Sequence, residues 1–195
     1  MSNEHTKPEA TDGFDKLNVR LGGNENRAKW RQHINGGGWL HESAAVHPTA
    51  YVGPEAIVWG RVYGNARVYG DARVYGNARV YGNAQVSGNA RVYGNARVYG
   101  NARVYGDARV YGDARVYGNA QVSGDAWEKP PLFIIGSRYS LTNAKHGHIQ
   151  IGCKCETFSW WLSKEALAFA KANGFTAAEI KEYRAYVRLF KEVGR

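Results

Sequence analysis

The chain has 195 residues, 44% hydrophobic and 22% charged, as in ordinary globular proteins. Its 26 Lys and Arg against 17 Asp and Glu give a formal net charge of +9, which favours anionic partners. The sequence has no long apolar run, which argues against a membrane span, and residues 1–16 are polar, which argues against a signal peptide. With Cys153 and Cys155 as its only cysteines, the chain is not a disulfide scaffold. These features together predict a cytoplasmic protein.

The N-terminal residues are predicted to form a tail and a cap. Residues 1–20 are polar and charged, which predicts a disordered tail. Residues 21–43 are predicted to be a cap segment, with a short helix over residues 25–34 that begins at Asn24. Trp39, which follows three glycines, is expected to plug the open end of the next domain, because an exposed strand edge needs cover.

A six-residue repeat dominates residues 44–126. Val occurs at every sixth position from Val62 to Val122, and the unit is Val-Tyr-Gly-Asn-Ala-Arg. A helix is excluded, because one Gly in each unit would cost about 1 kcal/mol every time. Ala, Arg, Val and Tyr alternate with the period of a strand, and Gly-Asn supplies a corner. The repeat therefore predicts a coil with Val and Ala inside and with Arg and Tyr outside.

The length of one coil follows from two interruptions of the repeat. The outward Arg-Tyr pair is replaced by Gln85 with Ser87 and again by Gln121 with Ser123, 36 residues later. With three hexads, or 18 residues, in a coil, both replacements fall on the same face of a three-sided prism, two coils apart. Stacked coils are expected about 4.8 Å apart. This less bulky face is expected to receive a neighbouring prism or the C-terminal helices.

In each hexad a small residue follows an aliphatic residue by four positions, as Ala66 follows Val62. This spacing resembles the hexapeptide repeats of the left-handed parallel β-helix superfamily. The resemblance implies a mainly β fold, a left-handed coil over residues 44–126 and a homotrimer. Many members of the superfamily are trimeric acyltransferases. Upstream, Val58 and Val62 are four residues apart instead of six, which predicts an irregular corner near Trp59 and Gly60.

Residues 127–195 are predicted to form a small α+β module that ends in a helical hairpin. Residues 132–135, 139–142 and 148–153 predict an antiparallel meander. Helices are expected over residues 158–172, capped by Thr157, and from the capping box of Thr176 and Glu179 to about Val193. The module resembles those of uncharacterised phage and mobile-element proteins at residues 135–138 and 151–153, which implies sequestration of a host factor as one role.

Acyl transfer requires a general base within reach of the acceptor. Residues 62–126 contain no His, Cys or Glu and no inserted loop. His41 and His47 at the first coil are the alternative bases, with acetyl-CoA as the cofactor in that case, but a surface position at the entry turn is favoured for both. Apart from that alternative, no cofactor is expected.

Four residues near one another in the sequence are candidate metal ligands: His146, His148, Cys153 and Cys155. On a regular strand the two cysteines would share a face with Ile149 and Ile151, opposite His148, so one ion could not reach all of them. A buried cysteine pair without metal is expected instead.

Nine arginines and nine tyrosines cover the outside of the predicted prism. The arginines are Arg61, Arg67, Arg73, Arg79, Arg91, Arg97, Arg103, Arg109 and Arg115, and the tyrosines are Tyr63, Tyr69, Tyr75, Tyr81, Tyr93, Tyr99, Tyr105, Tyr111 and Tyr117. Arg binds phosphate and Tyr stacks on bases. Alternatively, the Arg stems only cover the Tyr rings through cation–π contacts.

The sequence thus predicts a non-catalytic binding protein for an anionic ligand: a nucleotide, a nucleic acid or an acidic protein surface. Arg97, Tyr99, Arg103 and Tyr105 represent the predicted surface, together with Arg138 in the C-terminal module. Two alternatives stay open: a CoA-dependent acyltransferase, and a structural spacer that displays the C-terminal module to a protein partner.

Overall fold

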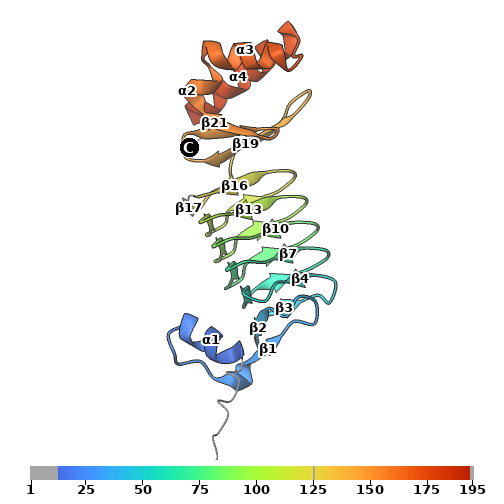
Figure 1. Ribbon diagram of the computed structural model, residues 1–195, viewed down its shortest axis with the longest axis vertical. Coiled ribbons are helices and arrows are strands. Elements are labelled where there is room, and N and C mark those ends of the chain that lie inside the picture. Colours follow the sequence, from blue (N-terminus) through green and yellow to red (C-terminus); the bar gives the residue numbers. More distant parts are fainter. Residues whose placement is uncertain (1–12, 125, 194–195) are drawn as a thin grey trace, which may run out of the picture.

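The computed structural model describes residues 13–124 and 126–193. Figure 1 shows a rod, with a short helix at one end, a stack of coils in the middle and a module of sheet and helices at the other end. The predicted fold class is confirmed as a parallel β-solenoid with a small C-terminal module. The handedness of the coil stays a prediction from the resemblance. Among the described residues, none of the helices has the length and apolar composition of a membrane span.

Each hexad forms one short strand and one corner. Val98 and Ala96 are fully buried, whereas Arg97 between them points outward. Gly100 follows with a φ of +70°, in the left-handed region that glycine enters without a steric penalty. The amide of Tyr99 donates to the carbonyl of the residue in the next coil, Val116, over 2.9 Å. The backbone polar groups of one coil are therefore satisfied by its neighbours.

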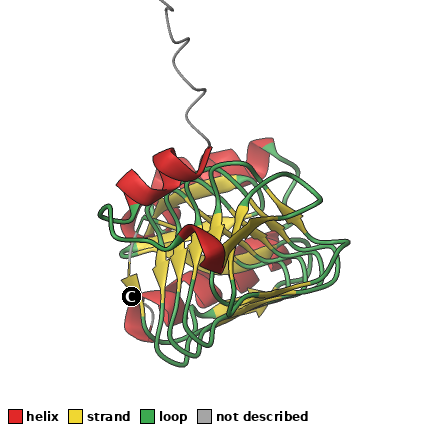
Figure 2. Ribbon diagram, turned by 90° about the horizontal axis from the view of Figure 1, so that it is seen from below, coloured by secondary structure: helices red, strands yellow, loops and turns green. Residues whose placement is uncertain are grey.

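The coils build three faces, which Figure 2 shows from the N-terminal end of the stack. Face A consists of β1 (Trp30–Gln32), β2 (Trp39–His41), β5 (Ile57–Val58), β8 (Arg73–Val74), β11 (Arg91–Val92), β14 (Arg109–Val110) and β17 (Ala126–Trp127). Face B consists of β3 (Ala45–Val46), β6 (Arg61–Val62), β9 (Arg79–Val80), β12 (Arg97–Val98) and β15 (Arg115–Val116). Face C consists of β4 (Tyr51–Val52), β7 (Arg67–Val68), β10 (Gln85–Val86), β13 (Arg103–Tyr105) and β16 (Gln121–Ser123).

The strand register confirms a coil of three hexads. Arg97 pairs with Arg115, 18 residues later in the chain. Gln85 and Gln121 both lie on face C, on either side of Arg103. The two interruptions of the repeat therefore share one face and lie two coils apart, as the sequence predicts.

The coil is shorter where the repeat loses its phase. Ile57 pairs with Arg73, only 16 residues later. A Cβ atom on Gly60 would lie 2.8 Å from the carbonyl oxygen of Ala78, so this corner has no room for a side chain. The irregular corner predicted near Trp59 and Gly60 is confirmed.

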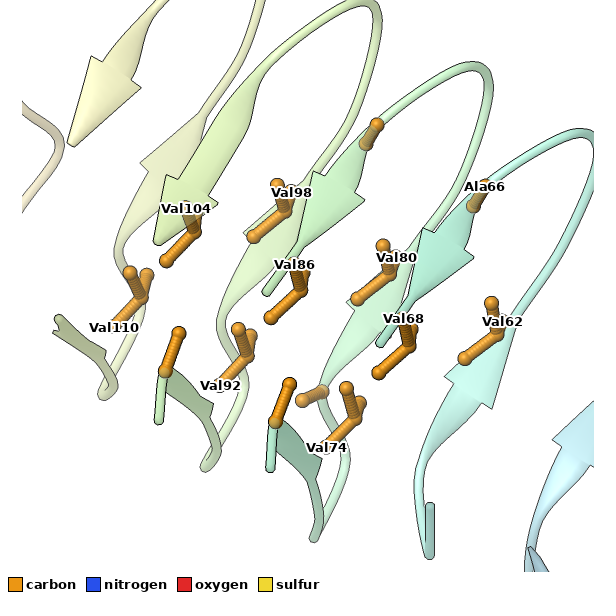
Figure 3. Close-up of a cluster of buried hydrophobic side chains, with 14 of the residues drawn as sticks. Val62, Ala66, Val68, Val74, Val80, Val86, Val92, Val98, Val104 and Val110 are labelled. Atoms are coloured by element: carbon orange, nitrogen blue, oxygen red, sulfur yellow. The ribbon is translucent and has the colours of Figure 1, made fainter. Parts of the chain in front are cut away.

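Rows of Val and Ala fill the interior of the solenoid, as Figure 3 shows. Every hexad Val from Val62 to Val122 is completely buried. Burial of one Val side chain contributes roughly 1.5–3 kcal/mol, so each coil adds a similar increment of stability. The predicted inside and outside positions are confirmed.

The predicted disordered tail is wrong for residues 13–20, and residues 1–12 lie outside the described residues. Residues 13–20 form helix α1 (Gly13–Arg20). Its Phe14 and Leu17 lie three residues apart on one helical face and pack against the first coil, which gives this short helix its stability.

The helix predicted over residues 25–34 is also wrong. Only a single 3₁₀ turn forms, η1 (Arg27–Lys29), and Asn26 rather than Asn24 caps it by accepting from the amide of Ala28. The chain then turns into β1, which pairs antiparallel with β2, because strand pairing satisfies the backbone at the end of the stack.

Leu40, not Trp39, closes the N-terminal end of the interior. Neighbouring residues of a strand point to opposite sides, and Leu40 is the one that joins the Val and Ala rows. Trp39 lies on the outside, where it packs against Phe14 of α1 and against Ile57. At the other end, Trp127 is 1% exposed and closes the last coil, with its ring parallel to that of His146.

The C-terminal module is a four-stranded antiparallel sheet followed by three helices. Its strands are β18 (Phe133–Ile135), β19 (Ser140–Lys145), β20 (His148–Ile151) and β21 (Lys154–Thr157), and its helices are α2 (Phe158–Trp161), α3 (Lys164–Ala172) and α4 (Ala177–Val193). The helix predicted over residues 158–172 is split, because the Ser163 side chain caps a new helix by accepting from the amide of Ala166. Thr157 caps α2 as predicted.

The predicted buried cysteine pair is wrong. Gly152, with a φ of +57°, and Cys153 form the turn between β20 and β21, so the strand does not continue through the two cysteines. Cys153 is exposed, and Cys155 is half-buried opposite Gln150 on the next strand. Among the described residues, no cluster of three or more His, Cys, Asp or Glu side chains could hold a metal ion.

Candidate anion-binding surface

Face B carries a column of four arginines above one another. The strand register aligns Arg61, Arg79, Arg97 and Arg115. Adjacent strands lie about 4.8 Å apart, which brings the positive charges of neighbouring coils close together. Together with the corner residues Asn77, Asn95 and Asp113, these arginines line a surface hollow of about 370 Å³.

A second, wider hollow of about 620 Å³ lies around the corner on face A. It is lined by Ser43, Trp59, Arg61, Arg73, Tyr75, Gly76, Asn77 and Arg91. Arg61 and Asn77 line both hollows, so the two form one continuous strip. We call this strip the basic edge and define it by Arg61, Arg73, Arg79, Arg91, Arg97 and Arg115.

The basic edge concentrates positive charge with little compensation. Among the residues that line its two hollows, Asp113 is the only acid. The pKa of the Arg73 guanidinium is lowered, first by burial and then by the positive charges of Arg20 and Arg91. Like charges at this spacing repel one another, so an anion that bridges them would be stabilised.

At the corner between faces A and B, the side chains of successive coils form a hydrogen-bonded ladder. The side-chain Nδ2 of Asn77 donates to Oδ1 of Asn95 over 3.5 Å, and Nδ2 of Asn95 donates to Oδ1 of Asp113 over 3.3 Å. Asn83, Asn101 and Asn119 form a similar ladder at the corner between faces B and C. These ladders hold the coils in register beneath the arginines.

The tyrosines of faces A and B stack on one another instead of presenting their ring faces. Tyr99 lies between Tyr81 and Tyr117, with ring centroids 4.9 and 5.5 Å away. Tyr75 and Tyr93 stack at 4.9 Å and are nearly parallel. Both faces of the Tyr99 ring are therefore occupied by neighbouring tyrosines, so this ring offers no free face to a base.

The structure does not bring the predicted binding residues into one site. Arg97 and Tyr99 lie on face B, whereas Arg103 and Tyr105 lie on face C, beyond the next corner. Arg138 lies in the C-terminal module, where it donates to the carbonyl of Gly174 and covers a neighbouring aromatic ring. Of the predicted set, only Arg97 belongs to the basic edge.

Sequence reasoning missed the contribution of face A to this surface. Trp59 lies one coil before Tyr75, and their rings meet edge to face with centroids 6.3 Å apart. The signal in the sequence was the loss of phase before Val62, which shortens the coil and places Trp59 in the tyrosine column of face A.

The two candidate histidines are held as corner residues. The amide of Ser43 donates to Nδ1 of His41 over 3.2 Å, and the amide of Thr49 donates to Nδ1 of His47 over 3.3 Å. Each Nδ1 also lies within hydrogen-bond distance of a hydroxyl, 2.9 Å from Ser43 Oγ and 2.8 Å from Thr49 Oγ1, so both rings are tied to their corner turns.

A separate apolar cavity of about 250 Å³ lies in the C-terminal module among β20, β21, α3 and α4. Two of its polar lining side chains have partners: the Tyr183 hydroxyl donates to the carbonyl of Tyr139, and Arg184 donates to the carbonyl of Leu162. Most of the residues that line the cavity are apolar.

The fold and the repeated outward rows define a β-solenoid repeat protein. The family model described as YdcK Beta solenoid repeat matches the chain in five overlapping stretches, at residues 61–74, 72–88, 84–99, 96–112 and 108–124. Comparisons with curated proteins and with solved structures found no match. The family match covers the coils that carry the basic edge and does not extend to the C-terminal module.

Proposed function

We propose that the protein is a non-catalytic binding protein whose basic edge binds a polyanion, with single-stranded nucleic acid as the ligand that the surface fits best. The observation that carries the proposal is the continuity of the two hollows, which share Arg61 and Asn77 and bring six arginines to one strip. The repeated guanidinium groups along the stack match a ligand that repeats its negative charges along a chain.

The shape of the surface favours a chain over a small molecule. The hollows follow the long axis of the solenoid and are open, whereas pockets for small ligands usually enclose most of the ligand. A guanidinium can bind a phosphate through two parallel hydrogen bonds, which suits it to a backbone of phosphates.

The stacked tyrosines support recognition of the phosphate backbone rather than of the bases. Stacking covers both ring faces of Tyr99 and one ring face each of Tyr81 and Tyr117, which reduces the flat surface that remains for bases. Contacts to phosphates carry no sequence information, so binding is expected to depend weakly on nucleotide sequence.

The proposal is tested by the anisotropy of a fluorescently labelled single-stranded oligonucleotide. The variant Arg79→Gln/Arg97→Gln removes two charges from the basic edge, and Arg67→Gln/Arg103→Gln removes two charges from face C. We expect at least a tenfold loss of affinity for the first variant and a much smaller loss for the second. Equal losses would mean that only the net charge matters, and no binding by the unmodified protein would refute the proposal.

A further inference from the structure

Face C differs from the other two faces in its outward rows. From coil to coil these rows alternate between bulky and small pairs: Arg67 with Tyr69, Gln85 with Ser87, Arg103 with Tyr105, and Gln121 with Ser123. On face B, by contrast, each coil from Arg61 to Tyr117 repeats the Arg-Tyr pair. The alternation has a period of two coils.

The alternation turns face C into ridges and notches. Tyr69 and Tyr105 are two coils apart, about 10 Å at the usual strand spacing, which is too far for their rings to stack. Among the described residues, no aromatic ring stacks on Tyr105. Ser87 lies between the two tyrosines, and its small side chain makes this row lower than its neighbours, which we call the notch. The Tyr69 hydroxyl leans toward this row and donates to Oε1 of Gln85 over 3.3 Å.

Neither end of the molecule covers face C. The C-terminal helices lie beyond the end of the stack (Figure 1), so they do not press on this face. Helix α1 packs on face A, through Phe14 and Leu17 against Trp39 and Ile57. The strands of face C carry only two arginines, Arg67 and Arg103, which is fewer than on either of the other faces. Two copies of this basic chain therefore repel one another least when they approach through face C.

We propose that face C is a self-association surface that pairs two copies of this chain with their solenoids antiparallel. The two-fold axis runs parallel to the strands, between the coil of Ser87 and the coil of Tyr105. This axis places Tyr105 of each copy in the notch at Ser87 of the other copy. It also places Tyr69 of each copy opposite Ser123 of the other copy, so all four rows are complementary.

The charges agree with the same arrangement. Because the two-fold axis runs along the strands, Arg103 of one copy lies opposite Gln85 of the other, and Arg67 lies opposite Gln121. Oε1 of Gln85 already accepts from the Tyr69 hydroxyl, and its second lone pair can accept from a guanidinium. In this arrangement no arginine directly faces another arginine.

A parallel arrangement lacks this match. If the solenoids run in the same direction, as in the homotrimer that the hexapeptide-repeat resemblance predicts, each coil meets the equivalent coil of the neighbour. The row of Arg103 and Tyr105 then meets a bulky row, and the row of Gln85 and Ser87 meets a small row. Bulky rows hold the faces apart, and voids remain between the small rows.

The antiparallel pair leaves the proposed binding surface open. The corner between faces A and B lies opposite face C in the three-sided coil, so the basic edge of each copy points away from the partner. Self-association and anion binding are therefore independent properties that separate variants can remove.

The first test is the subunit count of the purified protein by native mass spectrometry and by light scattering across a dilution series. Gln85→Arg/Ser87→Tyr/Gln121→Arg/Ser123→Tyr fills the notches with the pair that the other hexads carry, so its coils are expected to fold. We expect a dimer for the unmodified protein and at least a tenfold weaker association for this variant. The control, Arg97→Gln/Tyr99→Ser on face B, is expected to remain dimeric. A monomer or trimer for the unmodified protein, or a dimer that the notch-filling variant leaves unchanged, would overturn the proposal.

The second test fixes the direction of the two solenoids. In a background without Cys153 and Cys155, Tyr69→Cys and Ser123→Cys are made in separate chains and treated with a short bismaleimide. Paired sheets lie about 10 Å apart, within reach of such a reagent. We expect covalent dimers only when the two variants are mixed and allowed to exchange subunits. Efficient cross-linking of Ser123→Cys chains with one another would indicate parallel solenoids and overturn the proposal.

Discussion

Gly100 lies directly against Gly118 of the next coil: a Cβ atom on Gly100 would come within 3.1 Å of the amide nitrogen of Gly118. The corners of the solenoid therefore need glycine for two reasons. The backbone is left-handed there, with a φ of +70° at Gly100, and a methyl group would make a tight contact that the neighbouring corner could relieve only by shifting.

A comparison of Gly100 with Gly106 at the next corner distinguishes the cost of the left-handed backbone from the cost of close contact between coils. Gly106 has a similar φ of +62°, but a Cβ atom there would lie 3.9 Å from its nearest neighbour. We expect Gly106→Ala to lose about 1–2 kcal/mol for the left-handed conformation alone and Gly100→Ala to lose more. The free energy of unfolding in urea measures both. Equal losses would show that contact between coils does not restrict the corner.

The Tyr183 hydroxyl ties helix α4 to the sheet of the C-terminal module. It accepts from the amides of Arg138 and Tyr139 and donates to the carbonyl of Tyr139. Tyr183→Phe would leave the amides of Arg138 and Tyr139 without this partner in a partly buried place, at a cost of about 1–3 kcal/mol, whereas the carbonyl of Tyr139 still accepts from the amide of Gly136. A thermal or urea unfolding curve tests this, and a loss below about 0.5 kcal/mol would contradict the tie. Tyr186→Phe is a matched control on the same helix.

The two cysteines are expected to react at different rates. Burial raises the pKa of the Cys155 thiol, with Glu156 adding to the rise and Lys145 opposing it. At pH 8, a smaller fraction of Cys155 is therefore ionised to the thiolate than for a thiol of ordinary pKa. Because Cys155 is half-buried, access of a reagent to it is also limited. Cys153 is exposed in the turn and is expected to be alkylated first by iodoacetamide. Mass spectrometry of the modified peptides checks the order, and faster modification of Cys155 would refute it.

The capping box at the start of α4 predicts a pH dependence. The backbone and side-chain hydrogen bonds from Thr176 lower the pKa of the Glu179 carboxyl below its ordinary value of 4.5. Because the pKa is lower in the folded state, the charged carboxylate stabilises the fold above the ordinary pKa, and this contribution is lost as the pH falls through the folded value.

We therefore expect the unmodified protein to melt at a higher temperature than Glu179→Gln at pH 7. The difference is expected to shrink as the pH is lowered below 4.5. Circular dichroism at a series of pH values measures it. A difference that stays constant down to pH 2 would show that the charge of Glu179 plays no part.

The sequence predicted the solenoid because its evidence is repeated many times. Each Val from Val62 to Val122 supports the same inward position, and the Gln85 and Gln121 interruptions define the coil length. The ends of the chain lack such repetition. Whether Leu40 or Trp39 enters the interior depends on a register of one residue, which local sequence does not determine.

The candidate site was predictable in composition but not in position. The sequence identified the arginine and tyrosine columns, yet the open hollows arise where two faces meet at Asn77. Propensity also failed at Ser163, because a polar residue inside a helical pattern can cap a second helix instead of continuing the first. Such features depend on contacts between distant segments.

The salt dependence of oligonucleotide binding tests the central claim most directly. If the basic edge binds the phosphate backbone, the logarithm of the association constant falls linearly with the logarithm of the salt concentration, by about 0.7 for each phosphate neutralised on a single strand. With six arginines along the strip, we expect a slope of up to about −4 for the unmodified protein and a shallower slope for Arg79→Gln/Arg97→Gln. An affinity that does not change with salt, or the same slope for both proteins, would contradict binding at the basic edge.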